Sequence, residues 1–427
     1  MEGLRGFTWK KRYTILVILF SSVIMSYLDR MIISTAIPYI AKDFNLSPVS
    51  MGAVLSAFFI GYTTCQIPGG LLVDKFGARR ILIWSLGWWS AFTAFTGMVS
   101  SLVPMIWVRA LFGAGEGIAG VAAGSRAIAN WFPSKERGTA TAIMLSANSV
   151  GPALAPIIGV LIIAMWGWRA TFYTLTVPGI LILLWIWRSL PENPADKKGI
   201  TAAELEEIKE RASARVAAES KYSFWQVFTV PAVWQSSVIL FLYDFTIWGF
   251  RTWLPTYLVR GRGFGMMKMG FSVSLPFFAG TIGYMLGGWL SDKPFKNHRK
   301  IPLVTCQWLA AVCLYFTYSA ASPRTCIAWM TLSGLFLSIA LGAFWALPMS
   351  AVSKAITGRG LAIINMGGMI ASSATPLLIG YLVQLSGGGY GTTFTLMTSG
   401  CIASSLFALL VKTKNKEPEL AKAITAG

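Results

Sequence analysis

Long apolar stretches dominate the pattern of hydrophobic and polar positions along this chain. A helix needs about 20 mostly apolar residues to cross the hydrocarbon core of a bilayer. Segments of that kind recur along the whole sequence, at residues 13–41, 50–72, 79–100, 103–126, 137–165, 169–189, 233–258, 268–291, 301–320, 325–350, 358–385 and 391–412. The pattern therefore predicts an all-α membrane protein with twelve transmembrane helices.

One long polar segment, residues 190–232, separates the sixth predicted span from the seventh. It contains Thr201 three residues before Glu204, the capping-box signature of a helix N-terminus. We expect a cytoplasmic linker with a short amphipathic helix. The expected organisation is a six-helix bundle over residues 1–189, the linker over 190–232, and a second six-helix bundle over 233–427.

Composition agrees with a lipid environment. The 427 residues are 55% hydrophobic and 12% charged, whereas soluble domains carry about 25% charged residues. A formal net charge of +19 would also suit a nucleic-acid-binding protein. However, the basic residues lie at the ends of apolar runs rather than in one stripe. The membrane surface explains them better, so no nucleic-acid partner is expected.

Lysine and arginine are concentrated in alternate loops, which predicts the orientation because cytoplasmic loops are the richer in both. The rich segments carry Lys75, Arg79 and Arg80; Lys135 and Arg137; Lys197 and Lys198; Lys293, Lys296, Arg299 and Lys300; Lys354 and Arg359; and Lys412, Lys414 and Lys416. The other loops are poorer, apart from a cluster of Arg260, Arg262 and Lys268. We therefore expect both termini in the cytoplasm and a multi-pass protein of the plasma (inner) membrane.

The N-terminus and the cysteines indicate neither a signal peptide nor a cofactor. Basic residues 10–12 precede an apolar stretch, but that stretch is long, contains charges and lacks a small-residue cleavage site. We expect a retained first helix. The five cysteines form no CxxC pair, and the lone His298 lies in a basic loop. No metal site, disulfide framework or cofactor is therefore predicted.

The two halves of the chain repeat a short motif. Asp74 and Lys75 follow the second span, and Asp292 and Lys293 follow the eighth at an offset of 218 residues. A weaker echo joins Ser134-Lys135 to Ser353-Lys354 at an offset of 219 residues. Duplicated halves are typical of transporters whose binding site lies at the membrane midplane between the repeats.

The loop between the second and third spans carries the pattern G-x-x-x-D-[RK]-x-G-x-[RK]-[RK]. It is matched at Gly70, Asp74, Lys75, Gly77, Arg79 and Arg80. Here the chain resembles the major facilitator superfamily, of which this motif is a specific signature. A carboxylate at a helix end can pair with guanidinium groups and helix dipoles of neighbouring helices, so the motif and its copy at Asp292 are expected to stabilise one conformation. Positive-inside topology alone would explain single residues but not the full motif.

Four ionisable residues lie deep inside predicted spans, where charges are costly and indicate function. They are Asp29 and Arg30 in the first span and Arg109 and Glu116 in the fourth. The last two are seven residues apart, so they share one helix face. Three glycines lie between them or directly after Glu116 and allow close approach of a neighbouring helix, namely Gly113, Gly115 and Gly117.

These four charges sum to zero when all are ionised, and they permit proton exchange. A protonated acid releases an arginine to bind an anion, whereas a deprotonated acid competes for that arginine. This competition would couple anion transport to protons. The alternative is a static salt-bridge network that only holds helices together.

Other polar or aromatic side chains within the spans are candidates for substrate contacts. They are Tyr27, Tyr62, Gln66, Asn148, Trp345 and Asn365. Each one alone would also be explained as a hydrogen-bonded contact between helices.

The first half is similar to one branch of the superfamily, the anion:cation symporters, and especially to bacterial galactonate carriers. The resemblance is carried by residues 26–30, 56–58, Tyr62, 66–70, Arg109-Ala110 with Glu116, 131–133 and Glu136-Arg137. It implies that Asp29 and Glu116 are the proton-linked groups, that Arg30 contacts the substrate and that Arg109 pairs with the acids. It also implies that the sugar-acid site is lined by Tyr27, Tyr62, Trp345 and Asn365.

Three positions depart from that resemblance. Asn148 replaces a glutamine of the galactonate carriers, and Asp244 and Arg251 occupy positions in span seven that are usually uncharged there. The two charges would alter specificity by contacting an amino group or a second carboxylate. Alternatively, they pair through a third group, or Arg251 lies near the outer end in water.

The sequence therefore predicts a secondary active transporter rather than an enzyme. We expect a monomer that carries a small organic anion, a sugar acid or related carboxylate, together with protons by alternating access. Two alternatives are a proton-coupled drug or metabolite exporter, which would not need anion-facing arginines, and an anion exchanger or uniporter without proton coupling. An enzyme or receptor would need a nucleophile, metal or cofactor set, or a domain outside the membrane.

Overall fold

The computed structural model describes residues 9–209, 224–352 and 356–411. Regular structure in these ranges is helical, and the helices follow one another with short connections. The long helices are α1 (Lys11–Asp43), α2 (Pro48–Phe76), α3 (Ala78–Met98), α4 (Leu102–Trp131), α5 (Ser134–Ser189), α8 (Pro231–Thr256), α9 (Met266–Asp292), α10 (Lys300–Ser319), α11 (Pro323–Phe344), α13 (Thr357–Leu385) and α14 (Gly391–Leu410). The short elements are η1 (Pro194–Asp196), α6 (Ala202–Lys209), α7 (Phe224–Phe228), the π-helical turn η3 (Tyr257–Gly261) and α12 (Ala346–Ala351). The motif echo at Ser353-Lys354 and the basic C-terminal residues lie outside the described ranges.

The long α5 is two membrane spans divided at one residue. Gly167 has φ 80° and ψ 169°, a backbone conformation that residues with a side chain rarely adopt. The break lies between the predicted fifth and sixth spans. With α5 counted twice, the long helices supply the twelve spans of the predicted fold. Within the described ranges nine helices are long and apolar enough to cross a membrane. The helices α3 and α8 are not among them, because tryptophans and hydroxyl side chains lower the mean hydropathy of α3, and Asp244 and Arg251 lower that of α8 further.

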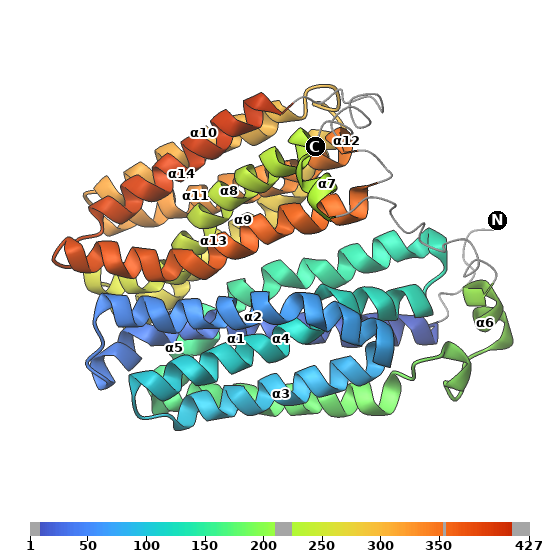
Figure 1. Ribbon diagram of the computed structural model, residues 1–427. Helices are drawn as coiled ribbons and strands as arrows, with labels where there is room; N and C mark the ends of the chain where they lie inside the picture. The colour runs from blue at the N-terminus through green and yellow to red at the C-terminus, as the bar shows by residue number, and fades with distance from the viewer. Residues whose placement is uncertain (1–8, 210–223, 353–355, 412–427) are drawn as a thin grey trace, which may run out of the picture.

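The helices form two bundles (Figure 1), one of α1–α5 and one of α8–α14. Within the first bundle α2 packs on α4 and α1 packs on α5. Within the second, α9 packs on α11 and α8 packs on α13. The second bundle thus repeats the helix pairs of the first, as expected of duplicated halves.

Glycines bring the paired helices into backbone contact. A Cβ at Gly113 of α4 would strike the carbonyl oxygen of Phe58 on α2, and one at Gly117 would strike that of Tyr62. In the second bundle Gly287 of α9 faces the carbonyl of Ile339 on α11 in the same way. The close approach predicted for Gly113 and Gly117 is confirmed. The third glycine of that run, Gly115, instead accommodates the indole of Trp88 on α3.

The two bundles meet near the end of the molecule remote from α6 and α7, and they separate toward α6 and α7 (Figure 1). The Ser56 hydroxyl of α2 accepts a hydrogen bond from the backbone N–H of Leu377 on α13 at 3.0 Å. A Cβ at Gly52 would lie 2.5 Å from the carbonyl oxygen of Pro376. On the other side of the interface, Gly270 of α9 packs on Val160 of α5. The structure is therefore closed at the end opposite the linker.

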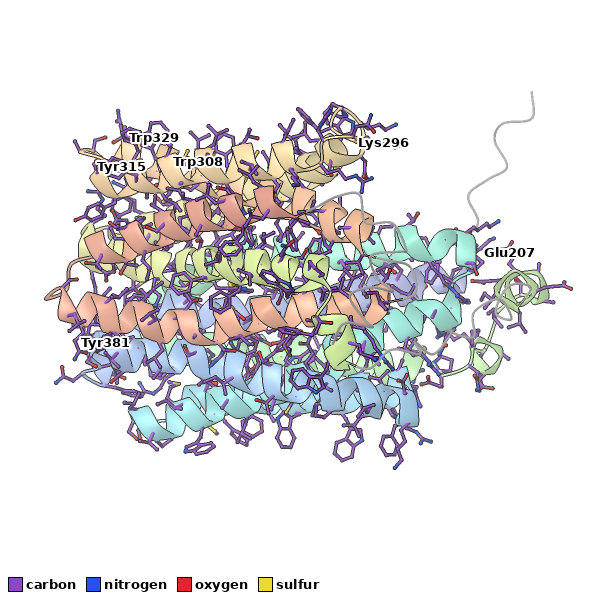
Figure 2. The ribbon with its side chains drawn as sticks, turned by 45° about the horizontal axis from the view of Figure 1, so that its top comes forward. Glu207, Lys296, Trp308, Tyr315, Trp329 and Tyr381 are labelled. Carbon is purple, nitrogen blue, oxygen red and sulfur yellow. The ribbon has the colours of Figure 1, made fainter. Side chains whose placement is uncertain are left out.

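Large apolar side chains cover the outer surfaces of both bundles. On the second bundle, Trp308 and Tyr315 of α10 and Trp329 of α11 point away from the helices (Figure 2). Tyr315 is 59% exposed and Trp308 is 44% exposed. An exterior of this kind fits a lipid environment and not water.

The predicted linker helix is present as α6, and it docks on the start of α1. Thr201 Oγ1 accepts a hydrogen bond from the Glu204 N–H at 3.2 Å, which confirms the predicted cap. The buried carboxylate of Glu204 accepts hydrogen bonds from the first backbone N–H groups of α1. At the same end (Figure 2), Glu207 pairs with Lys10 and Arg12, each at 2.8 Å. Hydrogen bonds from Lys10 and Arg12 lower the pKa of Glu207.

Candidate functional site

The four charged residues singled out in the sequence lie together inside the first bundle. Their exposed fractions are 1% for Asp29, 7% for Arg30, 1% for Arg109 and 3% for Glu116. The helix α1 contributes Asp29 and Arg30, and α4 contributes Arg109 and Glu116 from one face. Charges buried in this way are retained only where they are paired or serve a function.

Glu116 is the direct partner of Arg30. The distance from Arg30 Nη2 to Glu116 Oε1 is 2.5 Å. The hydroxyl of Ser26, one turn before Arg30 on α1, donates a hydrogen bond to the same oxygen. The other carboxylate oxygen, Oε2, is buried and makes no hydrogen bond with a described residue. Both contacts of Glu116 to α1 are therefore made by Oε1.

Aromatic rings surround the guanidinium of Arg30. Its Cζ lies 4.4 Å from the ring centre of Tyr27, 4.8 Å from that of Tyr62 and 4.9 Å from that of Phe58. These cation–π contacts fix the position of the cation without neutralising its charge. Arg30 can therefore exchange one anionic partner for another while it stays in place.

Asp29 and Arg109 lie behind this pair and have no direct ion pair in the described part of the chain. The guanidinium of Arg109 lies 4.4 Å from the ring centre of Phe112, and its Nε and Nη2 make no hydrogen bond. One oxygen of Asp29 is likewise without a partner. Asp29 interacts electrostatically with both Glu116 and Arg109. The resemblance implied that Arg109 pairs with the acids, whereas here the direct partner of Glu116 is Arg30.

A pocket with a volume of about 60 Å³ opens in front of Arg30, large enough for several waters or a small carboxylate group. The site residues predicted from the sequence that line it are Tyr27, Arg30, Tyr62, Glu116 and Asn148. It extends along Leu19, Leu82 and Met144, which lie toward the ends of their helices nearest the linker. The pocket therefore lies on the open side of the structure.

The helix α4 is kinked beside the pocket, which was not predicted. Gly120 has φ 43° and ψ −150°, outside the helical region, one turn after Glu116. It lines the pocket, and a Cβ there would lie 3.9 Å from the Tyr62 hydroxyl. Ser26 and Phe58 were also missed as site residues. The spacing of Ser26 from Arg30, one helical turn, was the available signal for it.

The remaining predicted substrate contacts lie outside this pocket. Gln66 is half-buried on α2, one turn after Tyr62. Trp345 follows the last residue of α11 and packs on Phe344, with 5.3 Å between ring centres. Asn365 is half-buried on α13 in the second bundle. The structure therefore brings most candidates of the first bundle together at the pocket, but not Gln66, and it leaves Trp345 and Asn365 in the second bundle.

The two unexpected charges of span seven both lie on α8. The carboxylate of Asp244 packs against Gly368 of α13. The guanidinium of Arg251 lies 5.4 Å from the ring centre of Trp248 and 5.8 Å from that of Phe277 on α9. The two charges interact electrostatically. Neither makes a hydrogen bond or ion pair with another described residue.

The signature motif lies at the linker end of α2 and α3. Asp74 pairs with Arg126 of α4 at 3.5 Å, and in the second bundle Asp292 lies 4.0 Å from Arg299. Gly77 separates α2 from α3 with φ 84°. The start of α3 is capped by Glu192, which accepts hydrogen bonds from the N–H groups of Ala78 and Arg79 at 3.0 and 2.9 Å. A carboxylate of the linker thus occupies the helix end beside the motif. The motif residues Gly70, Lys75 and Arg80 lie at the same end.

Two helical bundles with an apolar exterior and a charged pocket between membrane-spanning helices define a transporter. The profile of the Major Facilitator Superfamily matches residues 19–376, and the chain belongs to that family. It is a transporter and not an enzyme.

The chain is also similar to several named transporters. The chain is 34% identical to the probable galactarate/D-glucarate transporter of Escherichia coli K12, over 87% of this chain and 88% of the relative. It is 32% identical to the probable sulfoacetate transporter of Cupriavidus necator, over 92% and 91%. The fold is similar to that of a bacterial homologue of the human lysosomal transporter Spinster in an inward-facing conformation. That match has a TM-score of 0.75 and 18% identity, and it covers 98% of both chains.

Proposed function

We propose that the protein is a proton-coupled symporter of a small organic anion, a sugar acid or related carboxylate. The observation that carries this proposal is the buried pair of Arg30 and Glu116 on the wall of the pocket. An incoming carboxylate and Glu116 compete for one guanidinium. At an effective dielectric constant near 20, a charge pair about 4 Å apart is worth roughly 4 kcal/mol, so the charge of Glu116 decides the competition.

Charge balance explains why the anion would bring a proton. The four buried charges sum to zero, and a bound anion adds one negative charge to a site of low dielectric constant. A proton on Glu116 restores neutrality and releases Arg30 to the anion. Asp29, which interacts with Glu116 and Arg109, is the second group able to accept a proton. Coupling therefore follows from electrostatics within one bundle.

The named relatives support the substrate class. Galactarate and glucarate are sugar diacids, and sulfoacetate carries a carboxylate and a sulfonate. All are small, polar and anionic, as a pocket lined by Arg30, Asn148 and two tyrosines requires. A guanidinium on the wall of the pocket suits an anionic substrate and not a hydrophobic drug, so we favour an anion carrier over a drug exporter.

We infer that transport occurs by alternating access. In the proposed orientation both termini are cytoplasmic, so the open side of the structure faces the cytoplasm and the membrane is the plasma (inner) membrane. Separation of the bundles at the contacts of Ser56 with Leu377 and of Thr63 with Ser373 would open the other side. A single chain contains both bundles, so a monomer suffices.

The test is Glu116→Gln in proteoliposomes loaded with an organic acid. We expect proton-driven accumulation to disappear while exchange of internal for external anion continues, because glutamine carries no proton between the two sides. Glu206→Gln, on the exposed face of α6, is the matched control and should accumulate normally.

Uphill uptake by Glu116→Gln would show that the coupling group is assigned wrongly. If an imposed pH gradient leaves wild-type uptake unchanged in both directions, the protein is an exchanger or uniporter.

A further inference from the structure

The second bundle also places an arginine in the membrane region, and it forms no direct ion pair within the described part of the chain. Arg251 of α8 is half-buried, and its guanidinium lies over the rings of Trp248 and Phe277. Among the described residues nothing donates or accepts a hydrogen bond with it, and no carboxylate forms an ion pair with it. An unpaired guanidinium at this depth is costly, and its aromatic support holds it in one place.

Arg251 lies close to the boundary with the first bundle. The Trp248 ring, one turn before it, packs on Phe59 of α2 with 4.7 Å between ring centres. Phe59 in turn packs on Phe58 at 5.0 Å, and Arg30 lies over Phe58. A short series of ring contacts therefore joins the two arginines across the boundary between the bundles.

The facing helices α1 and α9 bring further polar groups to the same boundary. Tyr284 of α9 is two turns after Phe277, and its hydroxyl interacts electrostatically with that of Tyr27, which lies under Arg30. The helix α9, whose Phe277 lies under Arg251, therefore approaches the part of α1 that carries Tyr27 and Arg30.

Asp244 interacts electrostatically with Arg251 but forms no direct ion pair with it. It lies seven residues earlier on the same helix, which separates the two backbones by roughly 10 Å. Its carboxylate packs against Gly368 of α13, whereas the guanidinium of Arg251 lies over the rings of Trp248 and Phe277. The N–H groups of the Arg251 guanidinium are therefore available to donate hydrogen bonds to a ligand.

We propose that Arg251 binds a second acidic group of the substrate, so that the transported molecule is a small dianion held between Arg30 and Arg251. This inference rests on the proposed function, in which Arg30 binds the first acidic group. The two arginines belong to different bundles, so a dianion bridges the bundles and stabilises the state in which they close around it. The planar guanidinium suits a carboxylate or sulfonate, each of which accepts two hydrogen bonds.

The experiment compares matched acids that differ in one charged group. Galactarate and galactonate differ by a carboxylate in place of a hydroxymethyl group. Succinate and butyrate, and sulfoacetate and acetate, give shorter pairs. Binding to purified wild type, Arg251→Gln and Arg251→Lys is measured by calorimetry, and uptake is measured in proteoliposomes. The matched control is Arg260→Gln, an exposed arginine in the adjoining turn η3.

We expect wild type to bind at least one diacid about tenfold or more tightly than its matched monoacid, because hydrogen bonds between charged groups are stronger than those between neutral groups. In Arg251→Gln that preference falls to about threefold or less. Arg251→Lys keeps part of it, and Arg260→Gln keeps all of it. The loss is in diacid affinity relative to monoacid affinity, which a general folding defect would not produce.

The inference is overturned if wild type shows no diacid preference in any pair, or if Arg251→Gln keeps the preference. The proposed function survives either result as long as a monoacid is still accumulated with protons. It fails separately if wild type binds no organic anion, or if an imposed pH gradient leaves wild-type uptake unchanged in both directions.

Discussion

The two bundles share a scaffold but treat their buried charges differently. In both, glycines bring the equivalent helix pair, α2 with α4 or α9 with α11, into backbone contact. The first bundle adds a neutral set of four buried charges with a direct pair between Arg30 and Glu116. The second adds Asp244 and Arg251, half-buried and without a direct pair among the described residues. The two bundles therefore share their helix packing but differ in their buried charges.

This difference indicates a division of roles. An ion pair that a substrate can break couples binding to protonation, because one partner titrates. An arginine without a partner has nothing to exchange, so it adds attraction for one kind of ligand. We therefore expect the first bundle to determine whether transport is proton-driven and the second to determine which anion is preferred.

The largest effect should come from Arg30→Met. The substitution removes the proposed anion contact and leaves the Glu116 carboxylate buried without its counter-ion. Truncating one partner of a buried charge pair in a binding site costs roughly 2–5 kcal/mol of binding free energy, which corresponds to about a 30-fold or greater change in the dissociation constant. Calorimetry with the best-bound acid should show at least that loss for every mono- and diacid.

The matched control for Arg30→Met is Arg188→Met, an exposed arginine near the end of α5. It should bind as wild type does. Anion binding by Arg30→Met within about threefold of wild type would mean that the principal anion contact is not Arg30. The proposed assignment of roles to the two bundles would then be wrong.

The sequence was sufficient to predict features that depend on neighbours along the chain. Apolar periodicity predicted the spans on both sides of Gly167, and the Thr201/Glu204 spacing predicted α6. The run of glycines around residue 115 predicted that α4 would meet another helix closely. Each of these depends on one helix or one turn, where spacing in sequence determines spacing in space.

Contacts between side chains on different helices were harder to predict from the sequence. The sequence brought Arg30 and Glu116 to the same depth, but their direct pairing depends on how α1 and α4 are rotated against each other. The carboxylates of Glu192 and Glu204 cap α3 and α1 from a linker more than 100 residues away along the chain. No local pattern encodes such contacts, and the kink at Gly120 has no local signal beyond the glycine itself.

A moderate effect on thermal stability and transport is expected when a helix contact is overpacked in either bundle. Gly113→Ala places a methyl group against the Phe58 carbonyl, and Gly334→Ala in the second bundle places one 2.5 Å from the Pro276 carbonyl oxygen. Overpacking of this kind costs roughly 1–3 kcal/mol, so both variants should melt at lower temperature. Gly113→Ala also displaces α2 from the helix that carries Arg109 and Glu116, so its proton-driven uptake should fall further.

The measurement is proton-driven uptake per folded molecule, with melting temperature as the common scale. If the two variants lose transport in proportion to their loss of thermal stability, transport is no more sensitive to packing changes in the first bundle than in the second. That result would argue against the proposed division of roles.

The smallest effect should come from Asp244→Asn. This substitution removes a negative charge seven residues before Arg251 on the same helix. At an effective dielectric constant near 20, two charges about 10 Å apart interact by roughly 2 kcal/mol. Arg251 then attracts an acidic group more strongly, so diacid affinity should rise several-fold while monoacid affinity changes less. Asp196→Asn, exposed in η1, is the charge-matched control. A fall in affinity for both acids would instead mean that the Asp244 carboxylate accepts hydrogen bonds from the substrate, and the second bundle would then recognise hydroxyl groups as well as charge.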